Sequence, residues 1–157
     1  MKSIERYESQ FRELFGKGSG EPSWLALARR AALDRFVDKG FPRTDQEEWR
    51  FTNVASLSAT TFDLAKPVDG GRATALLKKL RFGEWKRHEI VFVNGRFEER
   101  LSSLNELPEG VVVESLARAL VDRGDVLESV LGEREDLDKT PFYELNRAFM
   151  VDGAFVQ

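Results

Sequence analysis

The period of the hydrophobic pattern changes once along the chain, and this change constrains the fold more than any other sequence feature. In the helical segments before about residue 80, apolar side chains recur every three or four residues, as in the segment 4–14, which is the spacing of an amphipathic helix. At residues 90–93 the pattern becomes an apolar, mostly β-branched run, followed by the hairpin signal Asn94-Gly95. The sequence therefore predicts an α+β fold, with an N-terminal helical region followed by a small segment of hairpin and helices.

Local signals place the first helices. A second helix is predicted to begin at Pro22 and to end at Gly40, since Pro suits a first helical turn and Pro42 cannot continue a helix. Thr44 and Glu47 fit a capping box at the start of a short helix. The core face of the second helix is expected to carry Trp24, Leu25, Ala28, Ala31, Ala32 and Phe36.

The second half of the chain is predicted to contain shorter elements. Helices are expected at 73–80, 116–121, 125–131 and 141–149, and strands at 90–93, 96–100, 111–113 and 154–156. Ser115 is expected to cap the helix that follows it. The strand at 154–156 has an unpaired apolar edge, so we expect weak self-association through this end of a chain cut from a longer protein.

Composition excludes several classes of function. The chain has 24 basic and 27 acidic residues, and this balance gives no basic footprint for nucleic acid. It has no cysteine, which excludes disulfides, thiolate catalysis and a cysteine-ligated metal, and favours the cytosol over a secreted design. We find no signal peptide pattern and no apolar run of about 20 residues that would span a membrane.

Few residues are candidates for chemistry. His88, the single histidine, is expected to be an exposed polar residue and not a base or metal ligand. Glu47 and Glu48 are adjacent, so on a helix they would not face each other across a substrate. Gly16 to Gly20 lacks the spacing of a phosphate loop. Remaining candidates are Ser102, Ser103 and Ser115, which lack a nucleophile elbow, and Asp136 and Asp138, which lack the rest of a calcium loop. We therefore assign no catalytic, cofactor-binding or metal-ligating residue.

Six aromatic residues offer two interpretations. They could form a platform on which bases stack, but packing in the core is the simpler account because aromatic side chains bury large areas. The six residues are Trp24, Trp49, Trp85, Phe36, Phe41 and Phe51.

Three blocks occur in order, at Trp24 to Leu57, Val91 to Leu120 and Pro141 to Val156. Together they resemble SufD-type iron–sulfur cluster assembly proteins of the SufB/SufD family. The first, Trp24 to Leu57, combines a Trp-Leu-initiated helix with Gly-Phe-Pro and Glu-Glu-Trp-Arg-Phe-Thr. The second, Val91 to Leu120, resembles the family's hairpin and Leu-Pro-x-Gly-Val strand. The third, Pro141 to Val156, resembles its entry into a large β-helix. The Gly-Phe-Pro helix ending and the hairpin block favour SufD over the related SufB.

The resemblance implies three parts: a helical region at 1–80, a small α/β segment at 81–150, and at 151–157 the start of a missing β-helix. It implies a cytoplasmic, non-catalytic assembly module whose partners are SufB-like and SufC-like proteins, bound through regions mostly absent from this chain. The resemblance implies no functional site residue, no cofactor, no nucleic-acid partner and no association with a membrane. Two alternatives stay open, namely a free-standing helical adaptor unrelated to cluster assembly and a small hydrolase or transferase that uses His88 or an acidic pair.

Overall fold

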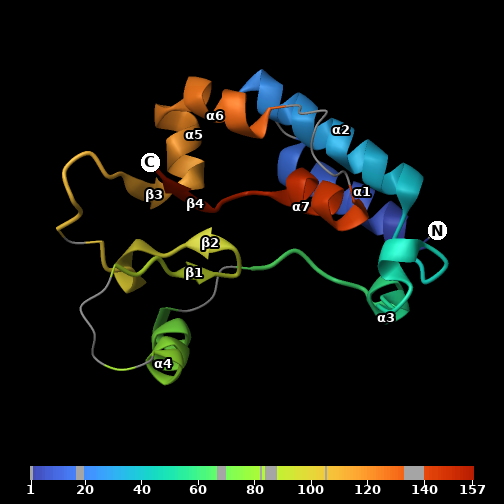
Figure 1. Cartoon of the computed structure of the whole chain (residues 1–157), viewed down its shortest axis with the longest axis horizontal. Helices are drawn as coiled ribbons and strands as arrows, with labels where there is room; N and C mark the ends of the chain where they lie inside the picture. Colours follow the sequence, from blue (N-terminus) through green and yellow to red (C-terminus); the bar gives the residue numbers. More distant parts are fainter. Residues whose placement is uncertain are drawn as a thin grey trace. The chain divides into compact units, whose positions relative to one another are not determined.

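The structure, a computed structural model, describes residues 2–16, 20–66, 70–81, 83, 88–104, 106–132 and 140–157. The chain forms two compact units, each built from two separate stretches of sequence (Figure 1). Unit 1 contains residues 1–64 and 123–150, and unit 2 contains residues 65–122 and 151–157. Unit 1 is helical and unit 2 carries small antiparallel sheets, so the predicted α+β class is confirmed.

Two long helices and the last helix build unit 1. Its elements are α1 (Lys2–Phe15), α2 (Ser23–Lys39), the 3₁₀ helix η1 (Glu47–Trp49), α3 (Ala55–Ala59), α6 (Gly124–Leu131) and α7 (Pro141–Phe149). Helices α2 and α7 pack along each other. The buried centre contains Phe11, Ala32, Leu33 and Ala148.

An aromatic network joins the helices of unit 1. The Tyr7 ring of α1 lies 5.5 Å from the ring of Phe36 in α2 and 6.0 Å from that of Phe149 in α7, both in edge-on geometry. Phe41 continues the network, with ring centroids 5.3 Å from Phe36 and 6.0 Å from Phe142. Edge-to-face pairs add about 0.5–1.5 kcal/mol each beyond the area they bury. The prediction of core packing is therefore confirmed for Phe36, which is buried, and Phe41 is half-buried beside it.

The signals for the end of α2 are confirmed, but the capping box after it is wrong. Gly40 ends α2 with a φ of 68°, and its N–H donates to the Phe36 carbonyl at 2.8 Å. Gln46, not Thr44, occupies the N-cap position of η1, and no side chain caps this short helix. Glu47 is then the first residue of η1 and lies too early to act as a capping-box acid.

Unit 2 is assembled from short elements. These are α4 (Gly70–Leu80), β1 (Phe92–Val93), β2 (Arg96–Phe97), the 3₁₀ helix η2 (Glu99–Leu101), β3 (Val113–Ser115), α5 (Leu116–Asp122) and β4 (Ala154–Val156). Strands β1 and β2 pair antiparallel, and the turn residues Asn94 and Gly95 have φ values of 51° and 76°. Positive φ at both positions is the geometry of a type I′ turn, so the predicted hairpin is confirmed.

Three predicted strands differ from the observed ones. The strand expected at 90–93 is limited to Phe92–Val93. The return strand of the hairpin ends at Phe97 instead of residue 100, because the chain then turns through η2. The strand expected at 111–113 lies at Val113–Ser115, after Gly110 with its φ of 81°. Its partner is β4, in a register that places Glu114 opposite Phe155. The strand predicted at 154–156 is thus confirmed and paired.

Candidate protein-interaction site

Among the residues that the structure describes, none forms a catalytic arrangement with His88. Its side chain is exposed, as predicted, and it forms no hydrogen bond or ion pair with any other residue that the structure describes. Glu47 and Glu48 are both exposed. Asp136, Asp138 and Trp85 lie outside the described residues, as do the three central residues of the segment from Gly16 to Gly20.

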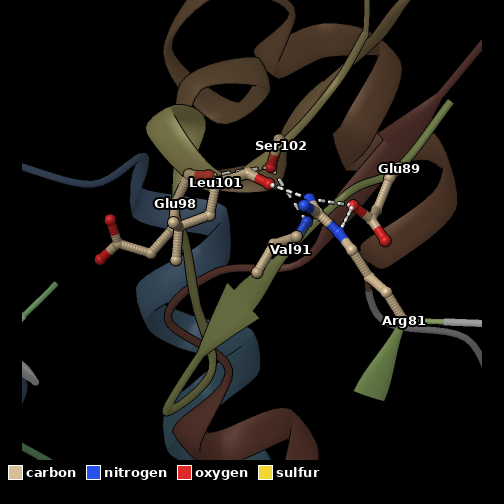
Figure 2. A network of polar contacts seen from close by, with 6 residues as sticks. All are labelled: Arg81, Glu89, Val91, Glu98, Leu101 and Ser102. Atoms are coloured by element: carbon tan, nitrogen blue, oxygen red, sulfur yellow. Dashed lines mark hydrogen bonds and ion pairs between the residues drawn. The ribbon is translucent and has the colours of Figure 1, made fainter. Parts of the chain in front are cut away.

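The hydroxyl of Ser102 forms hydrogen bonds at the point where η2 interrupts the main-chain pairing next to the hairpin (Figure 2). It accepts a hydrogen bond from the Val91 N–H at 2.9 Å and donates one to the Glu98 carbonyl at 2.8 Å. The next pair along, Glu89 and Ser103, exchanges two main-chain hydrogen bonds of 2.8 Å. Ser102 therefore has a structural role, since it replaces main-chain partners lost where η2 interrupts the strand.

Asp152 connects three elements of unit 2. Its Oδ2 accepts from the Phe97 N–H at 2.7 Å, and its Oδ1 accepts from Ser115 Oγ at 2.8 Å, the Gly153 N–H at 2.8 Å and the Ala117 N–H at 3.1 Å. Burial alone would raise the pKa of Asp152, but these hydrogen bonds outweigh it and hold the pKa below its usual value.

The hydroxyls of Ser102 and Ser115 therefore both form structural hydrogen bonds, while Ser103 bonds to Glu89 through its main chain. Ser115 Oγ bonds to Asp152 and also accepts a hydrogen bond from the Arg118 N–H at 3.3 Å, so Ser115 caps α5 as predicted. The described residues hold no group of three or more His, Asp or Glu side chains that could bind a metal ion.

Buried charges in unit 1 were missed by the sequence analysis. Arg29 of α2 is almost fully buried, where it pairs with Glu21, lies 4.5 Å from the centre of the Phe15 ring and donates to the Met150 carbonyl at 2.5 Å. Burial lowers the pKa of Arg29 to about 10. The sequence spacing could have indicated this burial, because Arg29 lies four residues from both Leu25 and Leu33, within the apolar stripe of α2.

Arg147 provides a second buried cation. Its guanidinium donates to the carbonyls of Leu131 at 3.0 Å and Gly132 at 2.8 Å, at the C-terminal end of α6. A cation there satisfies terminal carbonyls and complements the helix dipole. These buried charges fix the packing of unit 1 and are not accessible to a ligand.

The exposed apolar side chains of unit 1 that follow η1 form the best candidate site. Phe51 is 92% exposed, and Leu57 and Phe62 are also exposed, in a stretch that we call the 49–62 segment. Phe51 was expected in the core, and this expectation is wrong. Trp49 is only half-buried, with its ring 5.4 Å from that of Phe142. Trp24 is half-buried as well, so neither tryptophan is a fully buried core residue.

Polar contacts from α1 hold the end of this segment. Arg6 Nε and Gln10 Nε2 both donate to the Phe62 carbonyl, at 3.1 Å and 2.7 Å, and Arg6 pairs with Asp63. A hollow of about 360 Å³ lies alongside, lined by Arg6, Tyr7 and residues 58–62. Burial raises the pKa of Tyr7. The segment is therefore anchored at one end while its aromatic side chain at Phe51 faces solvent, an arrangement suited to contact with another protein.

Comparison with known proteins decides the family. The profile of the SufBD protein N-terminal region matches residues 1–157. The chain belongs to the SufBD family. A curated relative is the iron–sulfur cluster assembly SufBD family protein of Synechocystis, which is 32% identical over 136 residues.

This SufBD family chain spans less than a third of the Synechocystis relative. The alignment covers 87% of the chain and 29% of that protein. No solved structure matches the chain significantly. Among the described residues, no helix is long and apolar enough to cross a membrane.

Proposed function

We propose that this SufBD family chain is a non-catalytic protein-interaction module that acts in iron–sulfur cluster assembly. The observation that carries the proposal is the family match over residues 1–157 together with a relative whose name states that activity. The described residues support a binding role, because His88 is isolated while Ser102 and Ser115 bond to main chain and carboxylate. Family membership does not favour the alternatives of an unrelated adaptor or a small hydrolase.

We further infer that the chain is part of a SufD-type protein in a cytoplasmic SufBCD complex. The Gly-Phe-Pro ending of α2 and the hairpin block support SufD over SufB. Its partners would be SufB-like and SufC-like proteins. We keep as proposals the division at residues 80 and 150 and the view that residues 151–157 lead into a β-helix. The 49–62 segment, with its exposed Phe51, is the surface we assign to a partner of the assembly.

A genetic experiment tests the function. Inactivating the gene should lower the activity of cellular iron–sulfur enzymes, and the intact gene should restore it. The gene carrying Phe51→Ser should restore it less well, whereas Leu27→Ser, which alters an exposed residue of α2 outside the 49–62 segment, should restore it fully. Unchanged iron–sulfur enzyme activity after inactivation, under iron limitation as well, would contradict the proposal.

A further inference from the structure

Helix α4 of unit 2 is a basic amphipathic helix. Its sequence GGRATALLKKL holds three basic residues and no acidic one, together with Ala73, Leu76, Leu77 and Leu80 on one face. Leu76 is 50% exposed and Leu80 is 69% exposed, although both lie on the apolar side of the helix. A basic amphipathic helix with exposed leucines is typical of a surface that binds another amphipathic structure.

The apolar face of α4 borders a groove and not an open surface. A hollow of about 430 Å³ separates the helix from β1, lined by Arg72, Ala73, Leu76, Leu77, Leu80 and residues 91–94. That volume lies within the range of ligand pockets, about 300–1,000 Å³. Its floor and walls are mostly apolar side chains, so it would accept apolar side chains from a partner.

Polar contacts hold this groove at both ends. Asn94 Nδ2, in the hairpin turn, donates to the Lys66 carbonyl at 2.9 Å, just before α4. Just after α4, Arg81 Nε donates to Glu89 Oε2 at 2.8 Å, and Figure 2 shows the Arg81 guanidinium directed at this carboxylate beside the Leu101 carbonyl. Arg81 therefore ties the end of α4 to the hairpin, and Lys66 ties the chain before it, which lowers the cost of ordering the groove on binding.

Arg72 lines the groove, and helical spacing places Lys79 on the same side of α4. Arg72, Leu76 and Lys79 are spaced i, i+4 and i+7, so they lie along one side of the helix. Lys78 lies about 100° from Lys79 around the axis, on the side opposite the apolar face. The groove thus offers apolar walls beside one line of positive charge.

We propose that the groove between α4 and β1 binds an amphipathic helix of a partner protein that carries acidic residues along one flank. Its apolar side chains would enter between Leu76, Leu80 and β1, and its carboxylates would lie along Arg72 and Lys79, as in helix-in-groove recognition. The concave, walled shape favours such a helix over an anionic lipid surface, which binds helices whose apolar face is open. Binding in this groove does not depend on the proposed role in cluster assembly.

The test uses a designed helical peptide of about 18 residues, or five turns, with leucines on one face and glutamates on one flank. We expect the 157-residue chain to bind it and to show NMR shift changes confined to α4 and β1. A peptide with Gln in place of every Glu should bind at least about fivefold more weakly. Equal affinity for the two peptides, or no binding of either, would overturn the proposal.

Matched variants locate the contact. Lys79→Glu should weaken binding about fivefold, while Lys78→Glu should change it less than about twofold. Leu80→Ser should weaken binding more than Val121→Ser, which alters another exposed apolar residue of unit 2. Because all four side chains are exposed, circular dichroism should show unchanged folding. Equal effects of Lys78→Glu and Lys79→Glu, or binding of phosphatidylglycerol vesicles in place of the peptide, would contradict the proposed occupant.

Discussion

Arg35 of α2 and Glu144 of α7 form an ion pair across the main helix interface of unit 1, with Arg35 Nε 2.7 Å from Glu144 Oε1. Glu144 is fully inaccessible to solvent, whereas Arg35 keeps about a quarter of its side chain exposed. A carboxylate in such a site is tolerated only while a cation and hydrogen bonds compensate for its lost hydration. Among the described residues, Arg35 is the cation that pairs with the Glu144 carboxylate, so this pair helps to fix how α2 and α7 face each other.

Removing the cation of this pair should destabilise unit 1 strongly. We expect Arg35→Ala to lower the free energy of unfolding by about 3–5 kcal/mol, because it leaves the buried Glu144 carboxylate unpaired. Urea denaturation measures this loss. Arg30→Ala is the control, since Arg30 pairs with Asp34 on the exposed side of the same helix, and it should cost less than about 0.5 kcal/mol. Equal losses for the two variants would show that burial of Glu144 is not decisive.

Because Asp152 accepts four hydrogen bonds in unit 2, we expect the stability of unit 2 to fall at acid pH. Since the pKa of Asp152 is lowered by folding, its contribution to stability is complete above the unfolded value of about 3.9 and is lost as the pH falls through the folded pKa. Asp152→Asn should cost about 1–3 kcal/mol at pH 7, because an amide group cannot accept all four hydrogen bonds. Denaturation at several pH values should show this difference shrinking below about pH 4. A difference independent of pH would contradict this account.

A substitution at Gly95, in the turn between β1 and β2, tests the effect of backbone conformation on stability without a change in side-chain contacts. A Cβ at Gly95 would meet no atom within 4 Å, so Gly95→Val should act only through its φ of 76°, at a cost of about 1–3 kcal/mol. Gly124→Val is the matched control, because its Cβ would also meet nothing and its φ is not positive. Thermal unfolding compares the two variants. An unchanged melting curve for Gly95→Val would mean that the turn tolerates another conformation.

Among the described residues β4 pairs with β3 alone, and its other edge predicts weak self-association of the 157-residue chain. Main-chain bonds at Gly153 and Gln157 face β3, so by alternation the N–H of Val156 points to the opposite edge. Val156→Pro should therefore reduce association without loss of the β3–β4 pairing, whereas Gln157→Pro removes a bond to Val112 and should weaken that pairing. Sedimentation velocity over a range of concentrations checks both. A chain that stays monomeric at high concentration would show that this edge does not associate.

Local signals in the sequence predicted local structure well. Gly40, Asn94-Gly95 and Ser115 each act through their own backbone or nearest neighbours, and each has the predicted role. The capping box predicted at Thr44 is wrong because the observed N-cap, Gln46, lies only two residues away, and local sequence does not distinguish such close positions. Pairing of β3 with β4 joins residues about 40 apart, which no local pattern specifies.

Burial was predicted less well than conformation. Helical spacing identified the apolar stripe of α2, but it could not show that Arg29 is buried within it or that Trp24 is only half-covered. Burial depends on which distant groups cover a face: Glu21 and the Met150 carbonyl meet Arg29, and Glu144 of α7 pairs with Arg35. Phe51 was assigned to the core by residue type alone, and its exposure is the feature that now supports an interaction site.

The most direct measurement of the central claim is the affinity of this chain for purified SufB-like and SufC-like proteins from the same organism. Although the resemblance places most partner contacts outside this chain, isothermal titration of the 157-residue chain should show saturable binding to at least one of them through the 49–62 segment. The affinity should fall at least about tenfold for Phe51→Ser, as for truncation of an exposed aromatic anchor, and should be unchanged for Leu27→Ser. Absence of binding to both proteins, or equal affinity for the wild-type chain and Phe51→Ser, would contradict the account of this chain as an interaction module that acts through the 49–62 segment.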